Sequence, residues 1–415
     1  MKVHVYGNVL NLGFISVKML RSKGVDAILF LDDSSSLEQD YPWWDDTSID
    51  KDNLPEWIKY YKTFPFYLFP NKETNKMIQD FSKCDVAFVS CYGPMLAMKA
   101  KLPFVFISAG SDLNMIDLMY DFKRVLFTSA SLKSKIKKTI KILTYSPLQK
   151  RAIVKHANKV ISGAGYQYKN FIEKNGILHK TLKLNMPKDI KNYAAAFDEE
   201  LNEKYKKYKV VYFMLSRHTW VSVWNNYKGN DKFIKAFARF VKEYNPNVLF
   251  ICSTKGIDSE KSMKLVKDLD IEQYIEWVDD MPKHNLKRYQ SLPNMVMVDN
   301  FWHDKWQIQF PGDKEKPKIG FGFGSIESMA SKRPLITAFT DHEFYGNENP
   351  PIFNAFTIDE IYDAIVQSYK MENSELLEMG ERGYDFIEKW YDNESPENKI
   401  LEVIEQVYKE SFNAK

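Results

Sequence analysis

Cysteine is scarce in this chain, with only Cys84, Cys91 and Cys252 among 415 residues. None of them has the spacing of a zinc or iron–sulfur ligand set, so we expect no bound metal. Cys84 and Cys252 adjoin apolar strand-like runs, where a small buried thiol is the usual explanation. So few thiols suit a reducing compartment and argue against a secreted domain held together by disulfides.

A strong net charge is also missing, because 58 Lys and Arg are offset by 55 Asp and Glu. This balance argues against nucleic acid as a partner. No run approaches the ~20 apolar residues of a membrane span. The chain opens on strand-like residues 3–6, with no signal-peptide block before them. We therefore expect a cytoplasmic protein, or one attached peripherally to the inner face of the cell membrane.

Acidic residues are absent from one long stretch. Between Phe122 and Ile172 the chain has twelve Lys and Arg but no Asp or Glu. The lysines are interleaved with apolar residues at helical spacing, a pattern typical of a helix that lies on anionic lipid. Contact of residues 123–159 with a membrane surface is one interpretation of this stretch. A solvated basic face that shields an acceptor cleft is the other.

Most of the chain alternates short apolar strands with helices, which predicts α/β domains built on parallel sheets. The length favours two or three domains over one core, and a lysine-rich polar segment near residue 200 separates two such series. We expect domains at residues 1–195 and 205–392 and a helical segment at 393–415. The expected strands are 3–6, 27–31, 86–90, 104–107, 159–162, 210–215, 248–252, 275–278, 295–298 and 335–339.

Three glycines on alternate residues, Gly320, Gly322 and Gly324, form the most informative motif. Glycine lets the backbone approach a ligand closely. Ser325 is a good N-cap, so a helix is expected over residues 326–332, with Glu327 in its first turn. A loop that opens onto a helix N-terminus binds anions, and phosphate on the amides with a sugar hydroxyl on Glu327 predicts a nucleotide site. The expected ligand-binding residues are Gly322, Phe323, Gly324, Ser325, Ile326 and Glu327.

This stretch resembles the C-terminal signature of the retaining glycosyltransferases of the GT-B fold known as glycosyl transferases group 1. Two positions depart from the signature: its first Glu is Ile319, and a later Gly is Lys332. In that family the first Glu contacts the donor sugar, and the second, here Glu327, holds the ribose. The positions in register are Gly320, Phe321, Gly322, Glu327, Met329, Ala330 and Pro334.

The resemblance implies two doubly wound, Rossmann-like domains that face a cleft. It also implies transfer of a hexosyl or related sugar with retention, from a UDP or GDP sugar to a saccharide or lipid-linked acceptor, in cell-surface glycan synthesis. Family members usually pack their last helix on the first domain, and residues 393–415 are the corresponding segment here.

Ligands bind beyond the carboxyl ends of parallel strands, and that rule selects Arg217 after the strand at 210–215. In the family, an Arg there and a following Lys-Gly, here Lys228, embrace the donor diphosphate. Two cations neutralise the charge on the leaving group, so no metal cofactor is expected. Lys255 would reach the same phosphates unless it is an ordinary exposed lysine, and Met281 lies where the family cradles the base.

In the first half, the resemblance implies that Gly13 faces the donor phosphates, although a simple strand-to-helix turn also explains a glycine there. Asp112 follows the strand at 104–107, where some family members line the acceptor site. We expect Asp112 to face the acceptor as a catalytic residue, or to cap the next helix.

Two other functions remain open. Ile319 in place of a Glu favours a degenerate protein that binds nucleotide or glycan without catalysis. The residues Gly320-x-Gly322-x-x-Ser325, with Asp341 downstream, mimic a dinucleotide fingerprint and would suit a nicotinamide-dependent oxidoreductase. That motif needs a strand leading into the first glycine, whereas residues 313–318 are charged and contain proline.

Overall fold

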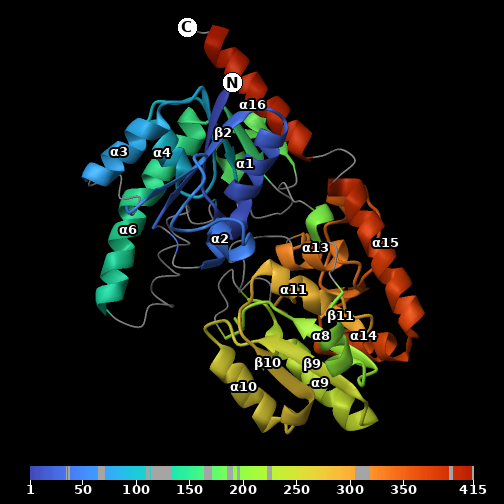
Figure 1. Cartoon of the computed structure of the whole chain (residues 1–415). Helices are drawn as coiled ribbons and strands as arrows, with labels where there is room; N and C mark the ends of the chain where they lie inside the picture. Colours follow the sequence, from blue (N-terminus) through green and yellow to red (C-terminus); the bar gives the residue numbers. More distant parts are fainter. Residues whose placement is uncertain are drawn as a thin grey trace. The chain divides into compact units, whose positions relative to one another are not determined.

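The chain forms two compact units in the computed structural model (Figure 1). Unit 1 comprises residues 1–188 and 394–415, and unit 2 comprises residues 189–393. Unit 2 begins at the polar segment that precedes residue 209. The structure describes all residues except 34, 36–37, 64–70, 109–112, 114–131, 163–170, 185–189, 194–196, 222–226, 304–317, 392–395 and 414–415.

Unit 1 is built on a parallel sheet of seven strands in the order β3-β2-β1-β4-β5-β6-β7. Its strands are β1 (Lys2–Tyr6), β2 (Asp26–Asp32), β3 (Ile58–Tyr61), β4 (Val86–Val89), β5 (Phe104–Ile107), β6 (Lys159–Ser162) and β7 (Thr181–Lys183). Its longer helices are α1 (Leu12–Ser22), α3 (Lys72–Phe81), α4 (Gly93–Lys99), α6 (Leu132–Arg151) and α16 (Pro396–Asn413).

Both faces of this sheet are buried. Along β4, Val86 and Phe88 belong to one apolar cluster while Ala87 and Val89 belong to another. The strand therefore reads as a continuous apolar run, as expected for a parallel sheet covered on both sides.

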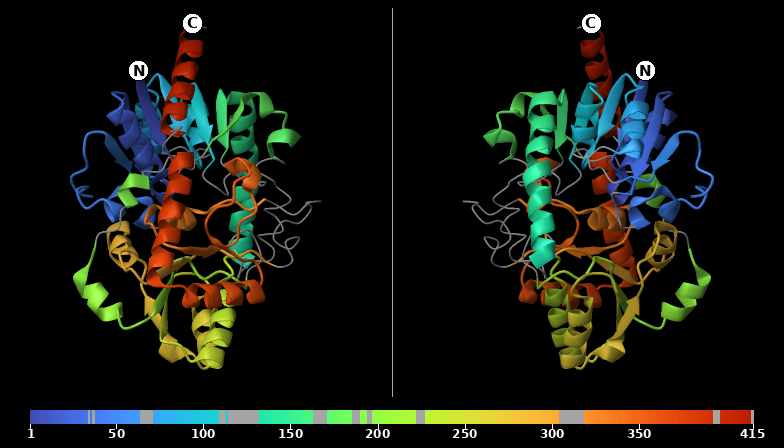
Figure 2. Two further views of the ribbon diagram at one scale, coloured as in Figure 1. Left: turned by 90° about the vertical axis from the view of Figure 1, so that its right-hand side faces the viewer. Right: turned by 90° about the vertical axis from the view of Figure 1, so that its left-hand side faces the viewer.

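Helix α16 completes one of these two clusters. Its residues Ile400, Val403, Ile404 and Val407 are buried with residues of α1 and of the central strands. In Figures 1 and 2 the helix runs beside the sheet of unit 1, and it contacts α1, β4 and β5. The last segment of the chain is thus part of the core of unit 1.

Unit 2 repeats the plan with six parallel strands in the order β10-β9-β8-β11-β12-β13. The strands are β8 (Val210–Met214), β9 (Val248–Ser253), β10 (Ile275–Val278), β11 (Met295–Val298), β12 (Leu335–Thr337) and β13 (Phe353–Asn354). The helices are α8 (Glu199–Tyr205), α9 (Asn230–Tyr244), α10 (Ser259–Asp268), α11 (Lys283–Gln290), α13 (Phe323–Ala330), α14 (Ile358–Lys370) and α15 (Asn373–Tyr391).

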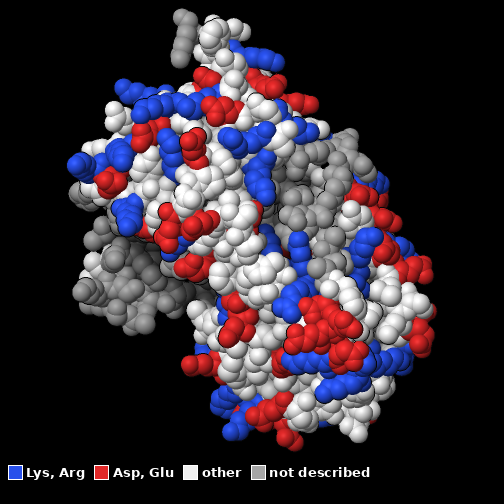
Figure 3. Space-filling model, viewed as in Figure 1, with Lys and Arg blue, Asp and Glu red and all other residues white. Residues whose placement is uncertain are grey.

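The predicted α/β class with two Rossmann-like sheets is confirmed, and each expected strand is present within a residue or two. The sequence reading missed three short strands, β3, β7 and β13. Among the described residues, no helix is long and apolar enough to cross a membrane. On the face shown in Figure 3, acidic and basic side chains intermingle, in keeping with the small net charge.

The start of α13 differs from the prediction. The helix begins at Phe323 with Gly322 as its N-cap, so Ser325 is its third residue and not the cap. Glu327 consequently lies in the second turn, and the first turn contains no acidic residue. The prediction failed because cap preferences describe local sequence, whereas here the acceptor for the helix amides comes from another element.

Candidate nucleotide site

The carboxyl ends of β8 and β11 lie side by side at the centre of the unit 2 sheet. From β8 the chain proceeds outward through β9 and β10, then returns to β11 on the other side of β8. Such a reversal of strand order is where open α/β sheets bind ligands. Arg217 follows β8, Asp299 follows β11, and α13 begins near Asp299.

The loop after β8 is held in place by a buried amide. The Asn230 side chain donates to the Ser216 carbonyl at 3.2 Å and accepts the Thr219 amide at 3.2 Å. Asn230 is fully buried at the start of α9. Because both ends of the turn are bonded to one side chain, Arg217 is carried on a fixed loop with its side chain exposed.

Lys228 is held between the loops that follow β8 and β11. Its amide donates to the Thr219 carbonyl at 2.8 Å, and its carbonyl accepts the Phe301 amide at 3.0 Å. Gly229 has a φ of +68°, and a Cβ there would lie 2.6 Å from the Phe301 Cβ. Glycine is therefore required next to Lys228 for both backbone conformation and space.

The first turn of α13 binds an internal carboxylate. The Ser325 hydroxyl donates to Asp299 Oδ2 at 2.6 Å, and the Ser325 amide also donates to this carboxylate. A Cβ on Gly324 would lie 3.2 Å from the Asp299 carboxyl carbon, and one on Gly322 would lie 3.3 Å from Oδ2. Two of the alternating glycines thus make room for Asp299, and the helix end predicted for a phosphate already holds a carboxyl group.

Asp299 and the cations influence each other's ionisation. Burial raises the pKa of Asp299, which is 5% exposed, although Lys228 and the Ser325 hydrogen bonds oppose that rise. Burial lowers the pKa of Lys228; Asp299 opposes that effect and the nearby Arg217 adds to it. Arg217, Lys228 and Asp299 therefore form one electrostatic group at the start of α13.

Glu327 contacts Tyr193 and Lys283, both of which are distant in the sequence. The Tyr193 hydroxyl donates to Glu327 Oε1 at 2.9 Å, and Lys283 Nζ lies 4.0 Å from the same oxygen. Lys283 is the first residue of α11, directly after Met281 and Pro282. Lys283 thereby places Glu327 close to the loop before α11. This loop contains Met281, which is half-buried and is predicted to contact the base.

Lys255 lies at the same loop. Its Nζ donates to Asp280, and the Thr254 hydroxyl donates to Asp279 Oδ1 at 2.8 Å. The geometry therefore associates Lys255 with the loop between β10 and α11.

His218 is a structural histidine. It is fully buried, its Nδ1 is bonded to the Ser262 hydroxyl at 2.8 Å, and burial lowers its pKa to about 4. Gly256 packs against its backbone, since a Cβ there would lie 2.3 Å from the His218 amide nitrogen. Because the imidazole of His218 is neutral and enclosed, it serves to pack the interior of unit 2.

Of the two residues predicted in unit 1, Asp112 lies outside the described residues. Gly13 is buried in the first turn of α1, where a Cβ would lie 2.6 Å from the Gly7 carbonyl oxygen. The Phe14 amide donates to Asn8 Oδ1 at 2.7 Å. Close packing of α1 on the β1 loop leaves no room for a side chain at Gly13, and its contact with the donor phosphates stays a prediction.

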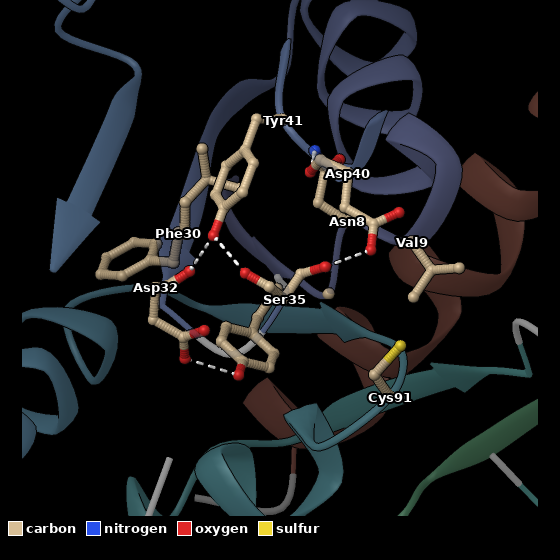
Figure 4. A pocket seen from close by; sticks show the side chains of 11 residues that line it. Asn8, Val9, Phe30, Asp32, Ser35, Asp40, Tyr41 and Cys91 are labelled. Carbon is tan, nitrogen blue, oxygen red and sulfur yellow. Dashed lines mark hydrogen bonds between the residues drawn. The ribbon is translucent and has the colours of Figure 1, made fainter. Parts of the chain in front are cut away.

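A small polar cavity lies beyond β1 and β2 in unit 1 (Figure 4). It is lined by Tyr6, Asp32, Ser35, Asp40 and Tyr41, and has a volume of about 40 Å³, enough for one water molecule. The Tyr6 hydroxyl donates to Asp32 at 2.7 Å, and the Ser35 hydroxyl donates to Asp40 at 2.5 Å. Burial, reinforced by the neighbouring acids, raises the pKa of Tyr41 to about 12.

The sequence analysis did not identify Asp299, Asp32 or Asp40. The strand-end rule that selected Arg217 also selects Asp299, which directly follows β11, and Asp32, which ends β2. No comparable signal marks Tyr193, which lies 134 residues from Glu327 in the chain.

Comparison with solved structures identifies the architecture. HepE from Anabaena, crystallised with UDP and glucose, superposes with a TM-score of 0.64 at 13% identity, covering 98% of this chain and all of its own. A glycosyltransferase from Rickettsia africae gives a TM-score of 0.62 at 14% identity, covering 98% of this chain and 99% of its own. The chain has the GT-B fold.

A third GT-B structure is also similar along its full length. Sucrose-phosphate synthase from Thermosynechococcus elongatus gives a TM-score of 0.59 at 11% identity, with both chains fully covered. No protein-family model and no curated protein sequence matches the chain. At this identity the structures establish the GT-B fold and no more.

Proposed function

We propose that this GT-B protein is a glycosyltransferase that uses a nucleoside-diphosphate sugar. The observation that carries the proposal is the grouping of Arg217, Lys228, the first turn of α13 and Glu327 at the switch point of the unit 2 sheet. HepE, which shares the fold, was solved with UDP-glucose. We therefore propose a UDP sugar as donor, with a GDP sugar as the alternative.

The residues of unit 2 suggest a role for each part of the donor. The diphosphate contacts Arg217 and Lys228, the ribose hydroxyls bind Glu327, and the base meets the backbone around Met281. When the bond between the sugar and the diphosphate breaks, the electron pair stays on the phosphate oxygen. Fixed cations at that oxygen stabilise the departing nucleotide and lower the barrier.

We propose that these two cations serve in place of a metal ion. The expected result is that treatment with EDTA leaves the transfer rate unchanged. Loss of activity that Mg²⁺ or Mn²⁺ restores would exclude this part of the proposal.

Retention of configuration at a hexosyl group is proposed from the signature around Glu327. Ile319 is 2% exposed, so its side chain packs in the interior and offers the sugar no carboxylate. We propose that other residues contact the donor sugar, and that the anomeric proton coupling in the NMR spectrum of the product reports the same configuration as the donor.

The proposed acceptor is a saccharide or a lipid-linked glycan that binds unit 1, and Asp112 is the residue proposed to act on it. The basic segment 123–159, which includes all of α6, would bring the enzyme to anionic lipid. Flotation with vesicles of phosphatidylglycerol tests the membrane contact, and recovery at the bottom of the gradient would contradict it.

The donor site is tested by thermal stabilisation with UDP and GDP sugars. A ligand at about 100 times its dissociation constant adds about 2.7 kcal/mol to the free energy of unfolding. Glu327→Gln is expected to lose most of this response. Glu381→Gln, which alters an exposed carboxylate paired with Lys332, is expected to keep it. An equal response in all three proteins would refute the assignment of Glu327.

The buried Ile319 also favours a second candidate function, a protein that binds the nucleotide sugar without transferring it. Release of free UDP from UDP-glucose in the presence of acceptor distinguishes the two. Saturable binding without any release of UDP would establish the binding protein. The oxidoreductase alternative loses support, because Lys318 and Ile319, directly before Gly320, do not form a strand.

A further inference from the structure

The buried carboxylate of Asp299 has no part in a simple phosphate site. A donor diphosphate would meet two cations and the positive end of α13, yet the structure places a carboxyl group among them. Asp299 is 5% exposed and is fixed by the Ser325 hydroxyl at 2.6 Å and by the Ser325 amide. Its carboxyl group is therefore held in one place beside any ligand that binds at this end of α13.

The charges around Asp299 come from several elements. Lys228, before α9, attracts it; Glu327, on α13, repels it; and Arg217, after β8, acts on Lys228. With Asp299 ionised, one of the two cations is offset internally. The site then has less positive charge left to neutralise a bound ligand than Arg217 and Lys228 would supply without Asp299.

The smaller positive charge of the site affects the substrate and the product differently, because these two ligands differ in charge. A nucleoside-diphosphate sugar has an esterified terminal phosphate, whereas the released nucleoside diphosphate exposes a terminal phosphate whose second pKa is about 6. Near pH 8 the product therefore carries about one more negative charge than the donor. A fixed carboxylate repels the product more strongly than the donor.

We propose that Asp299 is a specificity-determining residue that favours the nucleoside-diphosphate sugar over the free nucleoside diphosphate, and so promotes product release. This inference rests on the proposed function. It assigns to Asp299 a role in discriminating ligands by charge. Gly322 and Gly324 leave the space in which the Asp299 carboxylate reaches Ser325.

The test compares the affinities of UDP and UDP-glucose at pH 8 by calorimetry. Asp299→Asn keeps the shape of the side chain and removes its charge, and Asp299→Ser offers a second uncharged residue if the first variant folds poorly. Removing the charge is expected to tighten UDP binding more than UDP-glucose binding. The affinity of UDP relative to UDP-glucose should rise about tenfold.

Glu381→Gln is the control, because it removes the charge of an exposed carboxylate paired with Lys332 and leaves Asp299 and Ser325 unaltered. It is expected to change both affinities by the same factor. An unchanged or lower ratio in both uncharged variants would overturn the role of Asp299. Failure of either nucleotide to bind the unaltered protein would instead refute the proposed function, and the inference with it.

Discussion

At the residue scale, this site depends on individual charged groups and on glycines that have no side chain. Gly322 and Gly324 face the Asp299 carboxylate so closely that a methyl group would crowd it. The alternating glycines predict a phosphate loop, because glycine permits close approach of any anion. The sequence pattern thus predicts a bound anion at this helix end, where the fold places the carboxyl group of Asp299.

Buried histidines predict the pH dependence of stability. Burial lowers the pKa of His218 to about 4, so between pH 6.5 and 4 the unfolded chain binds the proton more readily. The free energy of unfolding therefore keeps its full contribution from the neutral His218 above pH 6.5. At pH 5 this contribution is smaller by about 2 kcal/mol. Measured by urea denaturation, the free energy of unfolding of His218→Asn is expected to change less between pH 7.5 and pH 5 than that of the unaltered protein.

The exposed His179 supplies the control for this measurement. His179→Asn should retain the pH dependence of the unaltered protein. If His218→Asn also retains it, then the buried imidazole does not titrate in this range.

At the element scale, strands and helices are assembled by contacts that local sequence only partly encodes. The start of α14 follows from its capping box, in which Thr357 and Glu360 bond each other's backbone amides. The start of α13 depends on Asp299, 26 residues before Ser325. Elements with their own end signals were predictable, and those capped by a distant residue were not.

The turn before α9 provides a prediction about the site. Gly229 and Gly24 both have positive φ, but only a Cβ at Gly229 meets other atoms, those of Phe301. Alanine at either position is expected to cost about 1–2 kcal/mol for the left-handed backbone. Only Gly229→Ala should also weaken nucleotide binding, because it displaces the Lys228 loop. Calorimetry with UDP on both variants checks this, and equal affinities would contradict it.

Helix α16 provides a prediction about stability. Ile404 is fully buried in the core of unit 1, whereas Phe412 on the same helix is 70% exposed. Ile404→Ala is expected to lower the free energy of unfolding by about 2–5 kcal/mol. Phe412→Ala should leave it nearly unchanged. Urea denaturation of both variants measures the difference, and a loss below about 1 kcal/mol for Ile404→Ala would show that α16 contributes little.

At the scale of the whole molecule, each unit contains its own apolar cores. The buried clusters of unit 1 draw on residues 3–177 and 400–407, and those of unit 2 draw on residues 190–391. No cluster combines residues of both units in the described part of the chain. Unit 2 is continuous in sequence, whereas unit 1 needs the last helix to complete its core.

This division predicts the behaviour of fragments. A fragment of residues 189–393 is expected to fold alone and to bind UDP, because Arg217, Lys228, Met281 and Glu327 all belong to it. A fragment of residues 1–188 should be unstable until residues 394–415 are added. Circular dichroism melting and calorimetry with UDP test both statements, and an unfolded 189–393 fragment would disprove the independence of unit 2.

The sequence by itself determined the α/β class, the two strand series and the helix behind the glycine motif. These depend on patterns of apolar residues and turn signals that are short and local. The tertiary structure alone decided the partners of each site residue. Tyr193 reaches Glu327 and Asp299 reaches Ser325 only after the parallel strands align their carboxyl ends. Alignment of that kind arises from burying both faces of a sheet, and no local pattern specifies which distant side chains it brings together.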